Sequence, residues 1–179
     1  MKKIAIASIM AVAAMTASAA DFVSVDIDRV KDSVTGQSST AQYIRAGKNI
    51  NGIQYGLQSR TARFHDDSGM LNSLELTAGK SFGIVSPFVG VGFDNGFNGA
   101  GPTQYGLVGA TTGTKVGPGF ALAGVKARVN DVSTKTNQTV VFATYSVPVA
   151  KNISVNLNAS KSYRDIKEDA VGLGLSFGF

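Results

Sequence analysis

The sequence predicts an all-β fold, namely an antiparallel up-and-down transmembrane β-barrel of ten strands. Apolar and polar residues alternate along most of the chain, with the two-residue period of a strand. Successive connections between the alternating segments lie at opposite ends of an up-and-down barrel, and those at one end are shorter than those at the other. Glycine is frequent, with 21 of 179 residues, and no stretch of 18 apolar residues occurs after position 20. The last observation excludes a helical membrane protein.

The first residues have the order of an export signal. Lys2 and Lys3 precede an apolar run, Ile4 to Met15, which is followed by the small residues Ala17 and Ala19. This run is shorter than the ~20 residues that a membrane-spanning helix needs, and the order is typical of a secretory signal peptide. We expect cleavage after Ala19, so that residues 1–19 are removed and residues 20–179 form a single outer-membrane barrel domain.

The first half of the chain contains five predicted strands, residues 22–30, 41–48, 52–64, 70–81 and 85–94. Four of them carry apolar side chains at every second position, opposite polar residues or glycine. These apolar residues are Val23, Val25 and Ile27, then Ile53, Tyr55 and Leu57, then Leu74 and Leu76, and finally Val85, Val89, Val91 and Phe93. Because the segment 41–48 alternates poorly, a count of eight strands is the alternative.

The second half contains five more predicted strands, residues 104–112, 120–129, 138–146, 153–164 and 170–179. The last two alternate most clearly, with Ser, Asn and Gly opposite the apolar positions. The apolar residues of the last three are Val141, Ala143 and Tyr145, then Ile153, Val155, Leu157 and Ala159, and then Val171, Leu173, Leu175, Phe177 and Phe179. Strands of this length suit a bilayer, which a tilted strand crosses in about 9 to 11 residues.

A soluble sandwich or soluble barrel also alternates apolar and polar residues. Such a protein would place charges densely on its outward face, whereas residues 153–160 and 171–179 carry none. The predicted connections 49–51, 82–84, 113–118 and 148–152 are shorter as a group than 31–40, 65–69, 95–103, 131–137 and 165–169. Short turns at one end and longer loops at the other are typical of a membrane barrel.

The last predicted strand ends the chain on an aromatic residue, in the run Ala170-Val-Gly-Leu-Gly-Leu-Ser-Phe-Gly-Phe179. It resembles the C-terminal signature of Gram-negative, porin-like outer-membrane β-barrel proteins. The resemblance implies that the barrel assembly machinery recognises Phe177 and Phe179, and that the protein is integral to the bacterial outer membrane and contacts its lipid. Since the chain has no Trp, Tyr and Phe must form the interfacial girdles, and we assign Tyr43, Tyr55, Tyr105, Tyr145, Tyr163, Phe64, Phe93 and Phe177 to them.

With the apolar face toward lipid, the lumen receives charged side chains, which we expect to be Asp26, Asp28, Arg45, Arg60, Glu75, Lys126 and Arg128. An unpaired charge in such a space is costly. Centring the hairpins places Asp26 opposite Arg45 and Arg60 opposite Glu75, and we predict an Arg60–Glu75 ion pair. These charges either line a polar path through the barrel or form salt bridges that block it. A third possibility is an apolar pocket for a lipid-like ligand. We also expect apolar bulk inside the lumen, from Phe88, Val108, Leu122, Val140 and Phe142.

The predicted function is that of a monomeric structural envelope component, whose lumen is either filled or leaves a narrow path for small solutes. A cell-surface interaction or adhesion protein that uses its outer loops is the alternative, and an outer-membrane hydrolase is the third. His65 precedes Asp66 and Asp67, but the run Asp66 to Gly69 is typical of a plain turn. We therefore predict no enzyme, no catalytic, cofactor-binding or metal-binding residue, and no cofactor.

Charge and cysteine content exclude further classes of function. The formal charge is +5, and it falls to +3 without Lys2 and Lys3, which is too small to indicate a nucleic-acid partner. The absence of cysteine excludes disulfide scaffolds and cysteine-ligated metal sites.

Overall fold

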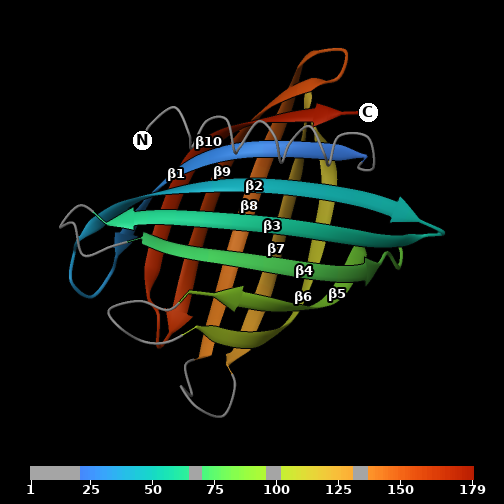
Figure 1. Cartoon of the computed structure of the whole chain (residues 1–179). Coiled ribbons are helices and arrows are strands. Elements are labelled where there is room, and N and C mark those ends of the chain that lie inside the picture. The colour runs from blue at the N-terminus through green and yellow to red at the C-terminus, as the bar shows by residue number, and fades with distance from the viewer. Residues whose placement is uncertain (1–20, 65–69, 96–101, 131–136) are drawn as a thin grey trace.

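The computed structural model describes residues 21–64, 70–95, 102–130 and 137–179, which form a closed antiparallel barrel of ten strands (Figure 1). Each strand pairs with its neighbours in the chain, and the first pairs with the last. The strands are β1 (Phe22–Asp32), β2 (Ser38–Ile50), β3 (Ile53–Phe64), β4 (Met70–Lys80), β5 (Val85–Asp94), β6 (Thr103–Val116), β7 (Gly119–Asn130), β8 (Asn137–Ala150), β9 (Ile153–Arg164) and β10 (Glu168–Gly178). The prediction of ten strands is confirmed.

Several predicted features lie outside the described residues. They include the signal peptide with Ala17 and Ala19, and the turn that contains His65. Among the residues that are described, no helix has the length and apolar character needed to cross a membrane.

Three strands, β2, β6 and β8, are each five residues longer than predicted. Their ends alternate weakly, but hydrogen bonding to the neighbouring strands continues the ladder there. The turns are correspondingly tight. Asn51 and Gly52 have φ of 52° and 81°, and Gly117 has φ of 55°, which are the positive values that two-residue hairpin turns require. We refer to this end of the barrel as the short-turn end, and to the opposite end as the outer end.

The side-chain alternation was assigned correctly in the first hairpins, but the predicted register is wrong by two residues. Asp26 pairs with Tyr43 rather than with Arg45, and Glu75 pairs with Gln58 rather than with Arg60. The turn between β1 and β2 explains the shift in the first hairpin. The Asp32 carboxylate accepts hydrogen bonds from the backbone N–H groups of Val34 at 2.7 Å and Thr35 at 2.8 Å. This Asx turn fixes the hairpin earlier in the chain than the midpoint of the predicted loop. A shift by two preserves the facing of every side chain.

The barrel is apolar outside and polar inside. On the outer wall, Val171 is 62% exposed and Leu173 is 59% exposed, whereas Asp26 and Glu75 inside are 1% and 3% exposed. A soluble barrel has the opposite arrangement, because water favours charges on its surface. The outer wall therefore contacts lipid, and the lumen holds the polar residues.

Three side chains face the opposite way from their prediction. Val108 lies on the outer wall, whereas Tyr43 and Tyr105, expected in the interfacial girdle, point into the lumen. In β6 both faces carry apolar residues, so the alternation did not define which face is inward, and Leu107 fills the lumen in place of Val108. Tyr55, Tyr163, Phe93 and Phe177 lie on the outer wall, as does Tyr145; the side chain of Phe64 lies outside the described part of the chain.

Inward-facing rings lie over glycines of neighbouring strands. A Cβ added at Gly92 would come within 2.2 Å of the Tyr105 ring, and one added at Gly124 within 2.6 Å of the Phe142 ring. At Gly90 the obstacle is backbone, because an added Cβ would lie 2.2 Å from the Leu76 carbonyl oxygen on β4. The glycines thus create the space that aromatic side chains and closely approaching strands occupy inside the barrel.

We predict that Gly90→Ala destabilises the folded barrel, because the methyl group collides with the backbone of β4. The expected loss is about 1 to 3 kcal/mol, which is typical of overpacking, measured as urea-induced unfolding in lipid vesicles. Gly106→Ala is the matched control, since its nearest neighbouring atom would be 4.0 Å away. Equal stability of the two variants would contradict the close approach of β4 and β5.

Candidate functional site

The candidate site is a chain of polar side chains that crosses the lumen. We call it the lumen network, and its members are Asp26, Arg45, Gln58, Glu75, Lys126 and Arg128. They come from β1, β2, β3, β4 and β7. The network follows the inner wall over the neighbouring strands β1 to β4 and then crosses the lumen from β4 to β7.

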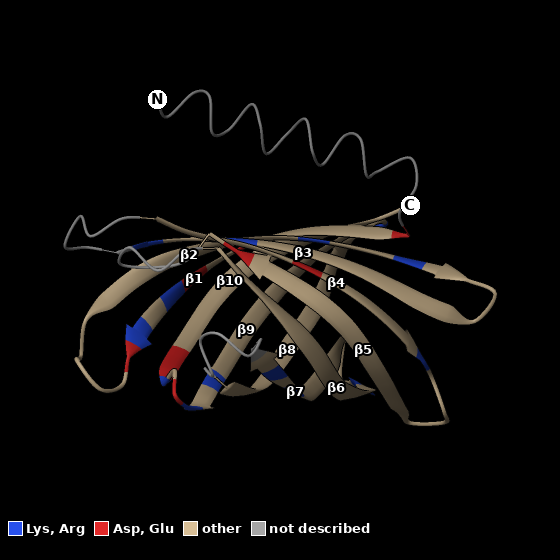
Figure 2. Ribbon diagram, turned by 60° about the horizontal axis from the view of Figure 1, so that its bottom comes forward, with Lys and Arg blue, Asp and Glu red and all other residues tan. Residues whose placement is uncertain are grey.

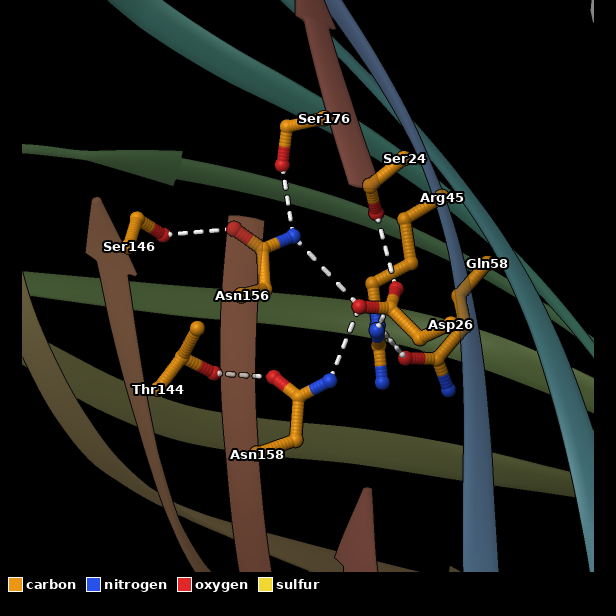
Figure 3. A network of polar contacts seen from close by, with 9 residues as sticks. All are labelled: Ser24, Asp26, Arg45, Gln58, Thr144, Ser146, Asn156, Asn158 and Ser176. Carbon is orange, nitrogen blue, oxygen red and sulfur yellow. Dashed lines mark hydrogen bonds and ion pairs between the residues drawn. The ribbon is translucent and has the colours of Figure 1, made fainter. Parts of the chain in front are cut away.

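Asp26 is the centre of the first half of the lumen network (Figure 3). Its carboxylate forms an ion pair with Arg45 and accepts hydrogen bonds from Ser24 Oγ at 3.0 Å and Asn158 Nδ2 at 2.8 Å. Asn156 Nδ2 lies 3.4 Å from the same carboxylate oxygen as Asn158. The buried charge is therefore both paired and hydrogen-bonded, as a buried carboxylate must be.

The two asparagines of β9 are themselves held in place. Thr144 Oγ1 donates to Asn158 Oδ1 at 2.9 Å, and Ser146 Oγ donates to Asn156 Oδ1 at 2.8 Å. Asn156 Nδ2 also donates to Ser176 Oγ at 2.6 Å. Figure 3 shows these contacts converging on Asp26 from one side, while Arg45 approaches from the other. On β10, Gly174 pairs with Asp26, and an added Cβ there would meet the carboxylate at 2.0 Å.

Glu75 is the centre of the second half. It accepts hydrogen bonds from Lys126 Nζ at 2.7 Å, from Tyr105 Oη at 3.2 Å, and from Arg128, with which it also forms an ion pair. The Arg128 guanidinium lies over the Tyr105 ring, 4.8 Å from the ring centroid, a distance suited to a cation–π contact. One carboxylate of β4 thus binds two cations from β7, which lies three strands further around the barrel.

Gln58 joins the two halves. Its Oε1 accepts a hydrogen bond from Arg45 Nε at 2.9 Å, and its Nε2 donates one to Glu75 Oε2 at 3.2 Å. An amide suits this position because it is both a donor and an acceptor. The path from Asp26 through Arg45, Gln58 and Glu75 to Lys126 is therefore continuous.

The predicted Arg60–Glu75 ion pair is wrong. Arg60 Nη2 instead pairs with Glu168 Oε2 on β10 at 3.2 Å, and its guanidinium lies 5.9 Å from the Tyr43 ring centroid. The reason is the register, which places Ser73 opposite Arg60, while the two cations of β7 occupy Glu75. Arg60 forms a separate contact across strands that are distant in sequence.

The seven predicted lumen charges all lie on the inner face of the barrel. Six of them form ion pairs. Asp28 is buried as well, and its Oδ1 has no hydrogen-bond partner among the described residues. Phe177 and Phe179 lie near the short-turn end, and their role in assembly stays a prediction.

Sequence reasoning missed several partners of these charges, namely Gln58, Tyr105, Asn156, Asn158 and Glu168. A signal for the asparagines was present, because they occupy the polar face of the clearest alternating strand. Within the described residues, no group of three or more His, Cys, Asp or Glu side chains is placed to hold a metal ion.

We predict that Glu75→Ala strongly destabilises the barrel, because it leaves Lys126 and Arg128 without their buried counter-charge. Breaking a buried ion pair from one side costs about 3 to 5 kcal/mol, and urea unfolding in vesicles measures the loss. The control is Asp169→Ala, which removes an ion pair that is exposed at both side chains. A small and equal effect of both substitutions would show that Glu75 is not buried among cations.

Comparison with known proteins finds similarity in the fold but not in the sequence. No protein family and no curated protein matches this sequence. Among solved structures, the β domain of the Bordetella autotransporter BrkA aligns with a TM-score of 0.53 and 11% identity, over 88% of this chain and 98% of that one. Neisserial surface protein A aligns with a TM-score of 0.46 and 14% identity, over 88% of this chain and 96% of that one.

The N-terminal β-barrel domain of Pseudomonas aeruginosa OprF aligns with a TM-score of 0.38 and 14% identity, over 89% of this chain and 98% of that one. At 11% identity, the likeness to the BrkA domain is one of fold alone. The closed barrel and its apolar outer wall show that this chain is an integral membrane β-barrel, a fold that it shares with the BrkA β domain.

Proposed function

We propose that this protein is a structural component of the bacterial outer membrane whose lumen is closed to sugars and other organic solutes and passes only water and small ions. The observation that carries the proposal is the lumen network, which follows the inner wall through Arg45, Gln58 and Glu75. From Glu75 it reaches across the lumen to Lys126 and Arg128. A solute would have to break charged hydrogen bonds in a space of low dielectric, where such bonds are strong.

Side chains on either side of the lumen network support the proposal. Toward the outer end, Val30, Ala41, Ala62 and Ala170 form a buried apolar cluster, against which Tyr43 and Leu71 pack. Toward the short-turn end, rings cover inward glycines, as Phe88 does at Gly109 and Phe120 at Gly113. A barrel of ten strands is close in size to eight-stranded barrels, which side chains fill completely.

The alternatives find no support in the described residues. An adhesion function would depend on outer loops, and the segments 65–69, 96–101 and 131–136 lie outside the part of the chain that the structure describes. The same holds for His65, on which the hydrolase reading rests. We propose neither function, and we expect the barrel to act as a monomer.

The test is conductance in planar lipid bilayers. We predict that the wild-type barrel shows only small conductance and that Gln58→Ala increases it, because the substitution opens the path without leaving an ionised group unpaired. Gln54→Ala is the matched control, since Gln54 lies on the same strand but contacts Ser81 at the exposed short-turn end.

Liposome swelling extends the test to uncharged solutes. Wild-type vesicles should exclude small sugars. Rapid entry of sugars through the wild-type barrel, or a conductance that Gln58→Ala leaves unchanged, would contradict closure by the lumen network.

A further inference from the structure

Charged residues on the outer wall gather on one side of the barrel at its outer end. There, Arg29 and Lys31 on β1, Arg63 on β3, Lys161 on β9 and Asp169 on β10 face outward. The described parts of β4 to β8 present no charged side chain outward in that half. We call Arg29, Lys31 and Lys161 the basic patch.

The basic patch spans three adjacent strands. Lys31 pairs with Asp169, and Asp169 pairs in turn with Lys161, so the three residues form one row. Figure 2 shows the basic segments of β1 and β9 on either side of the acidic segment of β10. Side chains directly opposite on one sheet face are about 5 Å apart at Cβ. Their charges therefore act on the same small area.

The single acid in the row does not neutralise the basic patch. Asp169 Oδ1 lies 3.0 Å from Lys161 Nζ, and Asp169 Oδ2 accepts a hydrogen bond from Ser33 Oγ at 3.1 Å. Both oxygens are thus engaged. Arg29 lies one row further from the rim, between Val171 and Thr40. The patch retains excess positive charge on a surface that faces the membrane.

An exposed apolar surface begins directly below the cations. Ile27, Leu157, Val171 and Leu173 are between 52% and 62% exposed, and they occupy the same three strands. A cation that faces lipid is costly at the middle of a bilayer and nearly free of cost at its surface. This order of charge above and apolar surface below matches an amphiphile with an anionic headgroup. A soluble anion has no apolar portion that could contact the exposed apolar residues.

We propose that the basic patch binds the phosphate groups of an anionic lipid of the outer leaflet, whose acyl chains lie against Ile27, Leu157 and Leu173. The proposal rests on the fold and on the outward facing of these residues. It is independent of whether the lumen is closed.

The probe is lipid A, an acylated glucosamine disaccharide that carries two phosphates, titrated against the folded barrel in non-ionic detergent. Native mass spectrometry measures the bound fraction. We expect the double variant Arg29→Ala/Lys31→Ala to bind more weakly, by about fivefold for each cation removed. Increasing ionic strength should weaken wild-type binding, because the attraction is electrostatic.

Lys48→Ala/Lys80→Ala is the matched control, because these lysines also face outward but lie at the short-turn end. Its affinity should equal that of the wild type. The shift in electrophoretic mobility on heating verifies that each variant is folded. Unchanged binding by the Arg29→Ala/Lys31→Ala variant, or equal weakening in the control, would overturn the proposal. Displacement of lipid A by millimolar inorganic phosphate would do so too, since it would indicate a site for soluble anions.

Discussion

Closure of the sheet is the constraint on which the rest of the structure depends. In a bilayer, water cannot satisfy backbone N–H and C=O groups, so a sheet has no tolerable free edge. Pairing of β1 with β10, from Phe22–Gly178 to Asp32–Glu168, removes both edges at once. Closure then determines polarity, because alternate side chains must face either lipid or the lumen. The apolar set faces lipid, which leaves the charged set inside.

The charged lumen in turn requires partners, and these determine how the interior is filled. Asp26 and Glu75 each gather several donors, and Gln58 connects them through Arg45. Glycines make the arrangement possible. Gly174 leaves room for the Asp26 carboxylate and Gly92 for the Tyr105 ring, which donates to Glu75. Paired groups in a buried polar network favour one arrangement of the interior, although Arg128 Nε has no hydrogen-bond partner among the described residues.

The sequence predicted the strand count and most facings, because alternation at period two depends only on which side of the sheet meets lipid. It failed in β6, where Tyr105 and Leu107 on one face and Val108 on the other are all apolar or aromatic. Register failed because it depends on turn chemistry, such as the carboxylate of Asp32, rather than on loop midpoints. Contacts across the lumen, such as Glu75 with Lys126, depend on barrel curvature and could not be predicted. Gln58 was missed because of the register error, since Arg45 and Glu75 lie directly opposite it only in the observed register.

We propose that Gln58 joins two charged clusters and that the resulting network closes the lumen. Nuclear magnetic resonance of the folded barrel in micelles tests it most directly, through the side-chain amide of Gln58. If Gln58 lies between Arg45 and Glu75, this amide should exchange its hydrogens slowly and show nuclear Overhauser contacts to both of those side chains. An amide that exchanges freely with water and shows neither contact would contradict it.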